Sequence, residues 1–370
     1  MHGFEKLSKN EMDSLASDVI RLSRLLTSER EDLPAAYLTD ERLRNAYRAY
    51  FLPSNLSKIH KPLQELSLHP RELFSKTKLR ILDIGAGPGT ASLGALTFFS
   101  RQERKQPQLE FTAVDQVAGN LKIAEALFSS HGATHELEAS LKTVRSDIEG
   151  LGKLLHGHFD VIILSNVMNE LYSREKSRTE KRVSILNTIL KRCLADDGSC
   201  IVIEPALRET SREMLEVRDG LVEDGFHVYS PCLFSGKCPA LANPRDWCHE
   251  DIPWDPPALV KEIDKLTGLR KDSLKFSYLV LRKDGLTLKD VSFENSFRVV
   301  SEPLVSKGKR EFYVCGAAGR RLVMRLDKDT TPRNELFGAL QRGTLVSFER
   351  LIDEGKRLKV GKETLVSCAL

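Results

Sequence analysis

A glycine-rich loop between an apolar stretch and a helical one constrains the fold of this chain more than any other feature. Residues 79–84 are predicted to form a strand, residues 90–99 a helix, and Gly85, Gly87 and Gly89 lie at alternate positions between them. Glycines in this arrangement let the backbone pass close to a bound ligand. A strand that runs through such a loop directly into a helix is typical of parallel α/β sheets. The loop therefore predicts an α/β fold with a ligand site at its first strand.

The strand–helix alternation continues to about residue 283. Further strands are predicted at residues 110–114, 141–144, 159–165, 199–204, 227–229 and 275–281. Helices are predicted at residues 90–99, 119–129, 181–193 and 208–223. This order predicts a Rossmann-like parallel sheet with helices on both faces.

The segments on either side of the α/β region have a different character. Residues 1–76 are expected to be a helical segment that only caps the fold, and residues 77–284 the α/β domain, with a cysteine-rich insertion at 230–257. Residues 285–370 contain short β-like runs separated by turn residues, which predict a small β-rich module, compatible with an oligonucleotide-binding-type barrel. From residue 301 onward, 14 Lys and Arg face 9 Asp and Glu. This excess of positive charge fits a polyanionic partner, although runs of charged residues more often simply form a solvent-exposed surface.

Composition excludes some classes of protein. The net charge of +4 is mild, and no apolar stretch has membrane-spanning length, so we expect no membrane partner. The N-terminus lacks an apolar signal core and carries acidic residues that transit peptides avoid. We expect a cytoplasmic, monomeric protein whose thiols are reduced, so that clustered cysteines favour metal over disulfides.

The glycine loop resembles motif I of class I S-adenosylmethionine (SAM) methyltransferases. Its spacing is Asp83-x-Gly-x-Gly-x-Gly, not the Gly-x-Gly-x-x-Gly of dinucleotide enzymes, and Asp83 is placed to hold a cationic amino-acid end. Asp115, at the end of the second strand, can accept both ribose hydroxyls or cap its strand. Asp147, after the third strand, is the position that recognises the adenine amino group in this superfamily, with a structural role as the equal alternative. We expect SAM as the cofactor.

The catalytic residues are harder to assign. Asn166 follows the fourth strand, and in this superfamily the residue at that position faces the methyl group of the cofactor and the substrate. Glu170 is either part of that site or a carboxylate at the start of a helix. No Asn/Asp-Pro-Pro-aromatic motif and no cysteine follows the fourth strand, and Asp255-Pro-Pro257 is interpreted as a rigid turn. The catalytic base is not visible, and Asn166 and Glu170 are the only candidates.

Three of the seven cysteines gather in a long connection between the last two predicted strands. Their spacing, Cys-x5-Cys-x9-Cys, is wider than that of common zinc sites, which makes zinc the weaker alternative. An iron–sulfur cluster takes four cysteines, and Cys315 is the best candidate for the fourth. Cys193 and Cys200 are interpreted as packing residues, and Cys368 as part of a frayed tail.

The chain resembles the methyltransferase-like proteins of the mitochondrial small ribosomal subunit and their bacterial and archaeal relatives. The resemblance rests on residues 82–90, 231–249 and 275–278, and on Cys315. It implies a SAM-type fold and association with small-subunit ribosomal RNA or a pre-ribosomal particle. It also implies a 4Fe–4S cluster held by Cys232, Cys238, Cys248 and Cys315, with His249 as the alternative to Cys248. Three functions remain open: a SAM-dependent RNA methyltransferase, a non-catalytic assembly factor, and a methyltransferase that acts on a small molecule or a protein.

Overall fold

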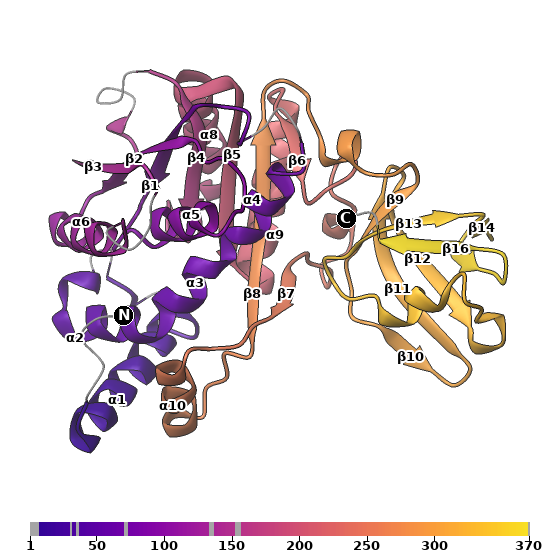
Figure 1. Cartoon of the computed structure of the whole chain (residues 1–370), viewed down its shortest axis with the longest axis horizontal. Helices are drawn as coiled ribbons and strands as arrows, with labels where there is room; N and C mark the ends of the chain where they lie inside the picture. Colours follow the sequence, from indigo (N-terminus) through magenta and orange to yellow (C-terminus); the bar gives the residue numbers. More distant parts are fainter. Residues whose placement is uncertain are drawn as a thin grey trace.

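The protein combines a helical N-terminal segment, an α/β sheet and a C-terminal β module (Figure 1). The computed structural model describes residues 7–29, 32–34, 37–69, 73–132, 137–151 and 157–368. The outermost residues of the first and last predicted segments, 1–6 and 369–370, lie outside the described residues. Among the described helices, none combines the length and the hydropathy that crossing a bilayer requires.

The N-terminal segment is helical, as predicted. Its elements are α1 (Lys9–Leu26), the short η2 (Tyr37–Thr39), α2 (Glu41–Ala46), the π-helical η3 (Tyr47–Phe51), α3 (Leu52–Lys58) and α4 (His60–Leu66). Helix α1 begins at a capping box in which the Ser8 side chain accepts from the Glu11 amide and the Glu11 carboxylate accepts from the Ser8 amide. Its apolar face packs into one core with the other helices of this segment.

A twisted sheet forms the centre of the molecule. Its strands are β1 (Lys78–Ile84), β2 (Gln108–Asp115), β3 (Ala139–Arg145), β4 (Phe159–Ser165), β5 (Leu194–Pro205), β6 (His227–Ser230), β7 (Glu250–Pro253) and β8 (Ser273–Arg282). The order is β3-β2-β1-β4-β5-β8-β6, with β1 to β5 parallel and β8 antiparallel to both its neighbours. This is the sheet of class I SAM methyltransferases, so the predicted fold class is confirmed.

Helices cover both faces of this sheet (Figure 1). Side chains of α5 (Thr90–Ser100) and α6 (Ala118–Gly132) join one apolar core with one face, and those of α8 (Arg178–Cys193) and α9 (Arg208–Glu223) join another core with the opposite face. The chain runs outward from β1 to β3 and then returns to place β4 on the other side of β1. A ligand crevice is expected where the strand order reverses, outside the carboxyl ends of β1 and β4.

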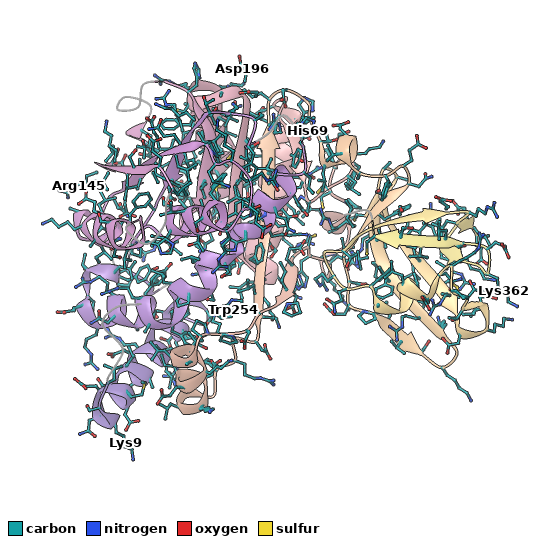
Figure 2. The ribbon with its side chains drawn as sticks, in the orientation of Figure 1. Lys9, His69, Arg145, Asp196, Trp254 and Lys362 are labelled. Carbon is teal, nitrogen blue, oxygen red and sulfur yellow. The ribbon has the colours of Figure 1, made fainter. Side chains whose placement is uncertain are left out.

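The long connection after β6 was interpreted as a loop with a rigid turn at Asp255-Pro-Pro257, and this is wrong in part. It contains the 3-10 helix η4 (Pro239–Ala242), strand β7, which pairs with β8, and helix α10 (Ala258–Thr267). Pro257 directly precedes α10, where a fixed φ suits a helix start. Val260 and Ile263 of α10 are buried in the core of the N-terminal segment, and Trp254 lies where the two regions meet (Figure 2).

The C-terminal module is a β-barrel. Its strands are β9 (Ser296–Val299), β10 (Leu304–Ser306), β11 (Lys309–Gly316), β12 (Gly319–Leu326), β13 (Leu345–Glu349), β14 (Ile352–Asp353), β15 (Leu358–Val360) and β16 (Leu365–Cys368). The main path is β15-β12-β11-β9-β13-β16. Strands β15 and β16 pair with opposite ends of this path and not with each other among the described strands, so the barrel is only partly closed. Cys368 is exposed but lies on a paired strand, so the expected frayed tail is wrong.

Candidate functional site

The glycine loop adopts a backbone that side chains rarely tolerate. Gly85, Gly87 and Gly89 have φ angles of 66°, 54° and 80°, in the left-handed region. A Cβ on Gly85 would lie 2.5 Å from Val167 Cγ2, and one on Gly89 2.9 Å from Ala124 Cβ, whereas one on Gly87 would meet nothing within 4 Å. The first and last glycines therefore permit close packing. Gly87 leaves its side of the loop open to a ligand.

Asp83 is buried beside this loop with one oxygen free of protein partners. Its Oδ2 accepts from the amide (3.0 Å) and the hydroxyl (2.6 Å) of Ser92, while Oδ1 has no hydrogen-bond partner among the described residues. Burial raises the pKa of Asp83 to about 6, and the nearby Asp115 adds to this, although the Ser92 hydrogen bonds oppose it. An ammonium group would satisfy this oxygen, so the pair of a free Oδ1 and an open glycine fits the amino-acid end of SAM.

Asp115 ends β2 and stabilises the loop. Its Oδ2 accepts from the Gly87 amide at 2.9 Å, and its Oδ1 accepts from the Val117 amide at 2.8 Å and from Asn120 Nδ2 at 3.3 Å. Asp147 is exposed and accepts from the Gly150 amide at 2.6 Å, which closes a turn after β3. The structure thus places both carboxylates after neighbouring strands, Asp115 against the loop and Asp147 at the surface.

The end of β4 is strained and tied to β5. Asn166 has a φ of 58°, which is uncommon outside glycine, and its amide donates to the Ile203 carbonyl at 2.8 Å. Both oxygens of the buried Glu204 accept from the backbone that follows, Oε1 from Met168 at 2.9 Å and Oε2 from Asn169 at 3.2 Å. Glu170 is exposed within the ensuing turn. Such a backbone conformation persists only where the surrounding structure holds it in place, and conformations of this kind are common at ligand-binding sites.

Two tyrosines of the helical segment reach the cofactor loop, which the sequence did not indicate. The Tyr47 hydroxyl lies 3.2 Å from Thr90 Oγ1, at the start of α5. Burial raises the pKa of Tyr37, and Glu170, Tyr47 and Asp115 raise it further. An aromatic ring in a segment that was expected only to cap the fold gave no sign of a contact with the site. The segment covers the crevice as well as capping the fold.

The four cysteines of the expected metal site line one cavity. Cys232 follows β6, Cys238 precedes η4, Cys248 precedes β7, and Cys315 lies on β11 of the C-terminal module. Burial raises the pKa of each thiol, and neighbouring thiols raise those of Cys238 and Cys315 further, to about 11 and about 12. In the part of the chain that the structure describes, no group of three or more His, Cys, Asp or Glu side chains is arranged to hold a metal ion.

Arginines surround this cavity. Arg218, Arg298 and Arg320 line it, and Arg298 Nη2 and Arg320 Nε are buried without a hydrogen-bond partner among the described residues. The guanidinium of Arg218 lies beside Cys232 and opposes the effect of burial on the pKa of that thiol. Unsatisfied donors and positive charge favour anionic sulfur in the cavity.

His249, the alternative to Cys248, stacks on Trp247 with ring centroids 3.9 Å apart. Burial, with Arg342 nearby, lowers its pKa to about 4, so the imidazole is neutral near pH 7. Its Nδ1 is buried without a hydrogen-bond partner among the described residues. Cys193 and Cys200 are buried in the core of the sheet, as predicted.

One protein family matches most of this chain. The sequence model of the family described as mitochondrial small ribosomal subunit Rsm22 matches residues 42–331. The chain belongs to the Rsm22 family. The Rsm22 match includes the glycine loop, the end of β4 and all four cysteines of the cavity, and it leaves out α1 and the last strands of the barrel. None of the curated proteins matches the chain.

Solved structures resemble this Rsm22-family chain at low identity. A class I SAM-dependent methyltransferase from Listeria monocytogenes, itself described as putative, is 14% identical, with a TM-score of 0.38 over 73% of this chain and 79% of that one. Fibrillarin from Aeropyrum pernix, solved with bound SAM, is 14% identical, with a TM-score of 0.33 over 62% and 76%. An rRNA methylase from Streptococcus thermophilus is 13% identical, with a TM-score of 0.34 over 60% and 94%.

Proposed function

We propose that this Rsm22-family protein binds SAM and uses it to methylate RNA of the small ribosomal subunit. The observation that carries the proposal is the free Oδ1 of buried Asp83 beside the open face of Gly87, at the point where the strand order reverses. A carboxylate in this position suits a ligand with a cationic amino-acid end and would repel a pyrophosphate. Membership of a small-ribosomal-subunit family supports ribosomal RNA as the acceptor.

In this proposal each group of the crevice has a separate task. SAM supplies a methyl group on a sulfonium, which a nucleophile can attack. Asp83 accepts from the amino group of the cofactor, Asp115 from its ribose hydroxyls, and Asp147 from its adenine amino group. The strained turn at Asn166 orients the acceptor, and Glu170 is the remaining candidate for a catalytic role. Tyr37 and Tyr47 exclude water from the crevice.

We further propose that Cys232, Cys238, Cys248 and Cys315 hold a 4Fe–4S cluster. Support comes from the convergence of these thiols on one cavity and from the unpartnered donors of Arg298 and Arg320. Cluster thiolates carry negative charge and accept hydrogen bonds, so the donor set fits the group. The cluster would join the insertion to the barrel, and its role would be structural. Zinc is the weaker alternative.

A second function is a non-catalytic assembly factor that binds SAM and the cluster. It is favoured by the absence of a recognisable catalytic motif after β4. Glu204 is a buried carboxyl on β5, the strand that pairs with β4. Both of its oxygens accept hydrogen bonds from backbone amides of the turn after β4. Burial raises the pKa of Glu204 to about 8, so near pH 7 this carboxyl mostly carries a proton already and does not accept another.

Purified protein, labelled SAM and small-subunit RNA test the proposal. We expect calorimetric binding of SAM and transfer of label to the RNA. Binding without transfer would support the assembly factor. RNA binding that fails in a salt titration would point to a small-molecule or protein substrate instead. Iron analysis of anaerobically purified protein tests the cluster, and stoichiometric zinc without iron would refute it.

A further inference from the structure

A polar cavity lies beside the crevice, between the helical segment and the sheet. Its volume is about 290 Å³, and Ser54 and Lys58 of α3 line one side. The stretch that leads into β8 lines the other and contributes Arg270, Lys271 and Lys275. Four cationic side chains and one carboxylate, that of Asp272, line the cavity, and this excess of positive charge suits an anion.

Lys58 is the decisive residue, because its amino group is buried without a hydrogen bond or ion pair among the described residues. Its side chain is only 7% exposed. Burial and the ammonium of Lys271 lower the pKa of Lys58 to about 7, while the carboxylate of Glu204 acts in the opposite direction. Burying an unpaired ammonium is costly, and an anionic ligand beside it would hold the side chain in its charged form.

The rim of the cavity suits a chain-like ligand. Arg270 and Lys275 have side chains that are 83% and 59% exposed, and each pairs with an exposed or half-buried aspartate. An anionic group can therefore reach buried Lys58 while the rest of its molecule stays at the surface between these two side chains. A phosphodiester backbone meets this description.

The cavity also lies on the acceptor side of the crevice. Glu204, whose charge acts on Lys58, ends β5 and holds the turn that follows Asn166. Strand β8 begins at Ser273, which lines the cavity, and its next residues pair with the end of β5. A nucleotide placed at the end of β4 would thus have its backbone next to α3.

We propose that this cavity binds a backbone phosphate of the RNA strand that is presented for methylation, with Lys58 as its buried cationic contact. The inference rests on the proposed function, since it assumes an RNA acceptor at this edge of the sheet. Lys58 acts as a binding and positioning residue. A free phosphate offers the same chemistry, and the test separates the two sources.

The experiment measures the affinity of the full-length protein for a short single-stranded small-subunit RNA at several salt concentrations. Lys58→Gln should weaken binding at least about tenfold and reduce the slope of log affinity against log salt by about 0.7, one phosphate contact. Lys191→Gln, at an exposed position of α8, is the matched control and should change neither. An unchanged slope in Lys58→Gln would overturn the inference.

Two further measurements keep the result interpretable. Lys58→Met should raise the thermal midpoint of the ligand-free protein, since it removes a buried charge, while it weakens RNA binding as Lys58→Gln does. Loss of stability with unchanged RNA affinity would contradict the proposal. If inorganic phosphate binds at this site but the RNA slope does not depend on Lys58, the occupant is a free anion and the strand assignment fails. If Lys58→Gln lowers the slope of log affinity against log salt but the wild-type protein transfers no methyl group to RNA, the phosphate subsite is supported and only the proposed methyltransferase activity is refuted.

Discussion

Arg298 of the barrel donates from Nη1 to Oε1 of Glu65, on α4, at 2.7 Å, and both side chains are only 3% exposed. Tyr278 of β8 donates to the other carboxylate oxygen of Glu65 at 2.6 Å. Arg298 also donates to the Gly343 carbonyl at 2.8 Å, and it lines the cysteine cavity. One buried ion pair thus links the helical segment, the sheet, the barrel and the expected metal site.

Breaking this pair from one side should destabilise the whole molecule. Arg298→Met leaves the buried Glu65 carboxylate with Lys61, 3.0 Å away, as its one remaining cation among the described residues. Removing one partner of a buried ion pair costs about 3–5 kcal/mol. Urea unfolding measures the change. The exposed pair of Lys261 and Asp255, 2.7 Å apart, provides the control, because Lys261→Ala should cost less than about 1 kcal/mol. Equal effects of the two variants would show that the buried pair does not organise the fold.

The same pair predicts how stability depends on pH. Burial alone would raise the pKa of Glu65, but Arg298 and Lys61 outweigh it and lower the pKa to about 2. Since an unfolded glutamate titrates near ~4.3, the contribution of Glu65 is present above that pH and is lost as the pH falls toward about 2. The difference in unfolding free energy between the wild type and Glu65→Gln should therefore shrink below about pH 4.3. A difference that stays constant down to pH 3 would contradict this assignment.

Asp83 should control SAM binding through its charge. Its pKa is raised to about 6, so the ligand-free carboxyl takes up a proton as the pH falls through that value, and SAM affinity should drop there. Asp83→Asn should weaken SAM binding at least about tenfold by calorimetry, and the pH dependence should vanish with it. The raised pKa means that the ionised form of Asp83 destabilises the folded protein near pH 7. Asp83→Asn removes that charge, so the variant should be at least as stable as the wild type at this pH. Unaltered SAM affinity in Asp83→Asn would exclude this crevice as the site.

Gly87 tests the open face of the loop. Gly87→Ala should lower SAM affinity, since the new methyl group would project into space that the cofactor needs. Gly225→Ala is the matched control: Gly225 has a φ of 96° and equally open surroundings, but it lies in the turn between α9 and β6. Both variants place an alanine at a positive φ, so only a difference in SAM binding is informative. The same loss in both would mean that strain, and not the ligand contact, explains the effect.

The cysteine cavity makes a prediction about iron. Cys315→Ser should lose iron together with the loop variants Cys232→Ser and Cys248→Ser, because a cluster needs all its thiolates. Cys368→Ser, an exposed thiol elsewhere on the barrel, should retain it. Iron content per chain after anaerobic purification decides the matter, and iron retained by Cys315→Ser would remove the barrel from the site.

Local pattern was enough to predict every strand of the α/β sheet except β7. The bounds of β4 (Phe159–Ser165) and α9 (Arg208–Glu223) follow from runs of apolar residues at periods of two and 3.6, which burial on a sheet face imposes. Helix α10 was missed because its apolar face is short and follows Pro256 and Pro257, which by themselves indicate a turn. Proline is also common at the start of a helix, so the same residues are compatible with α10.

Long-range pairing could not be predicted in this way. Glu65 and Arg298 are 233 positions apart, and nothing in either neighbourhood indicates the partner. Lys58 ends a short polar-looking helix, where an exposed lysine is the ordinary expectation, yet tertiary packing buries it. The cysteine cavity was easier, since three cysteines close together in the sequence stand out by residue type alone.

Modification mapping of small-subunit RNA tests the central claim most directly. Cells that lack the protein should lose a methyl group at a defined nucleotide, wild-type protein should restore it, and Asp83→Asn should not. Small-subunit RNA with the same methylation in the presence and absence of the protein would contradict the account.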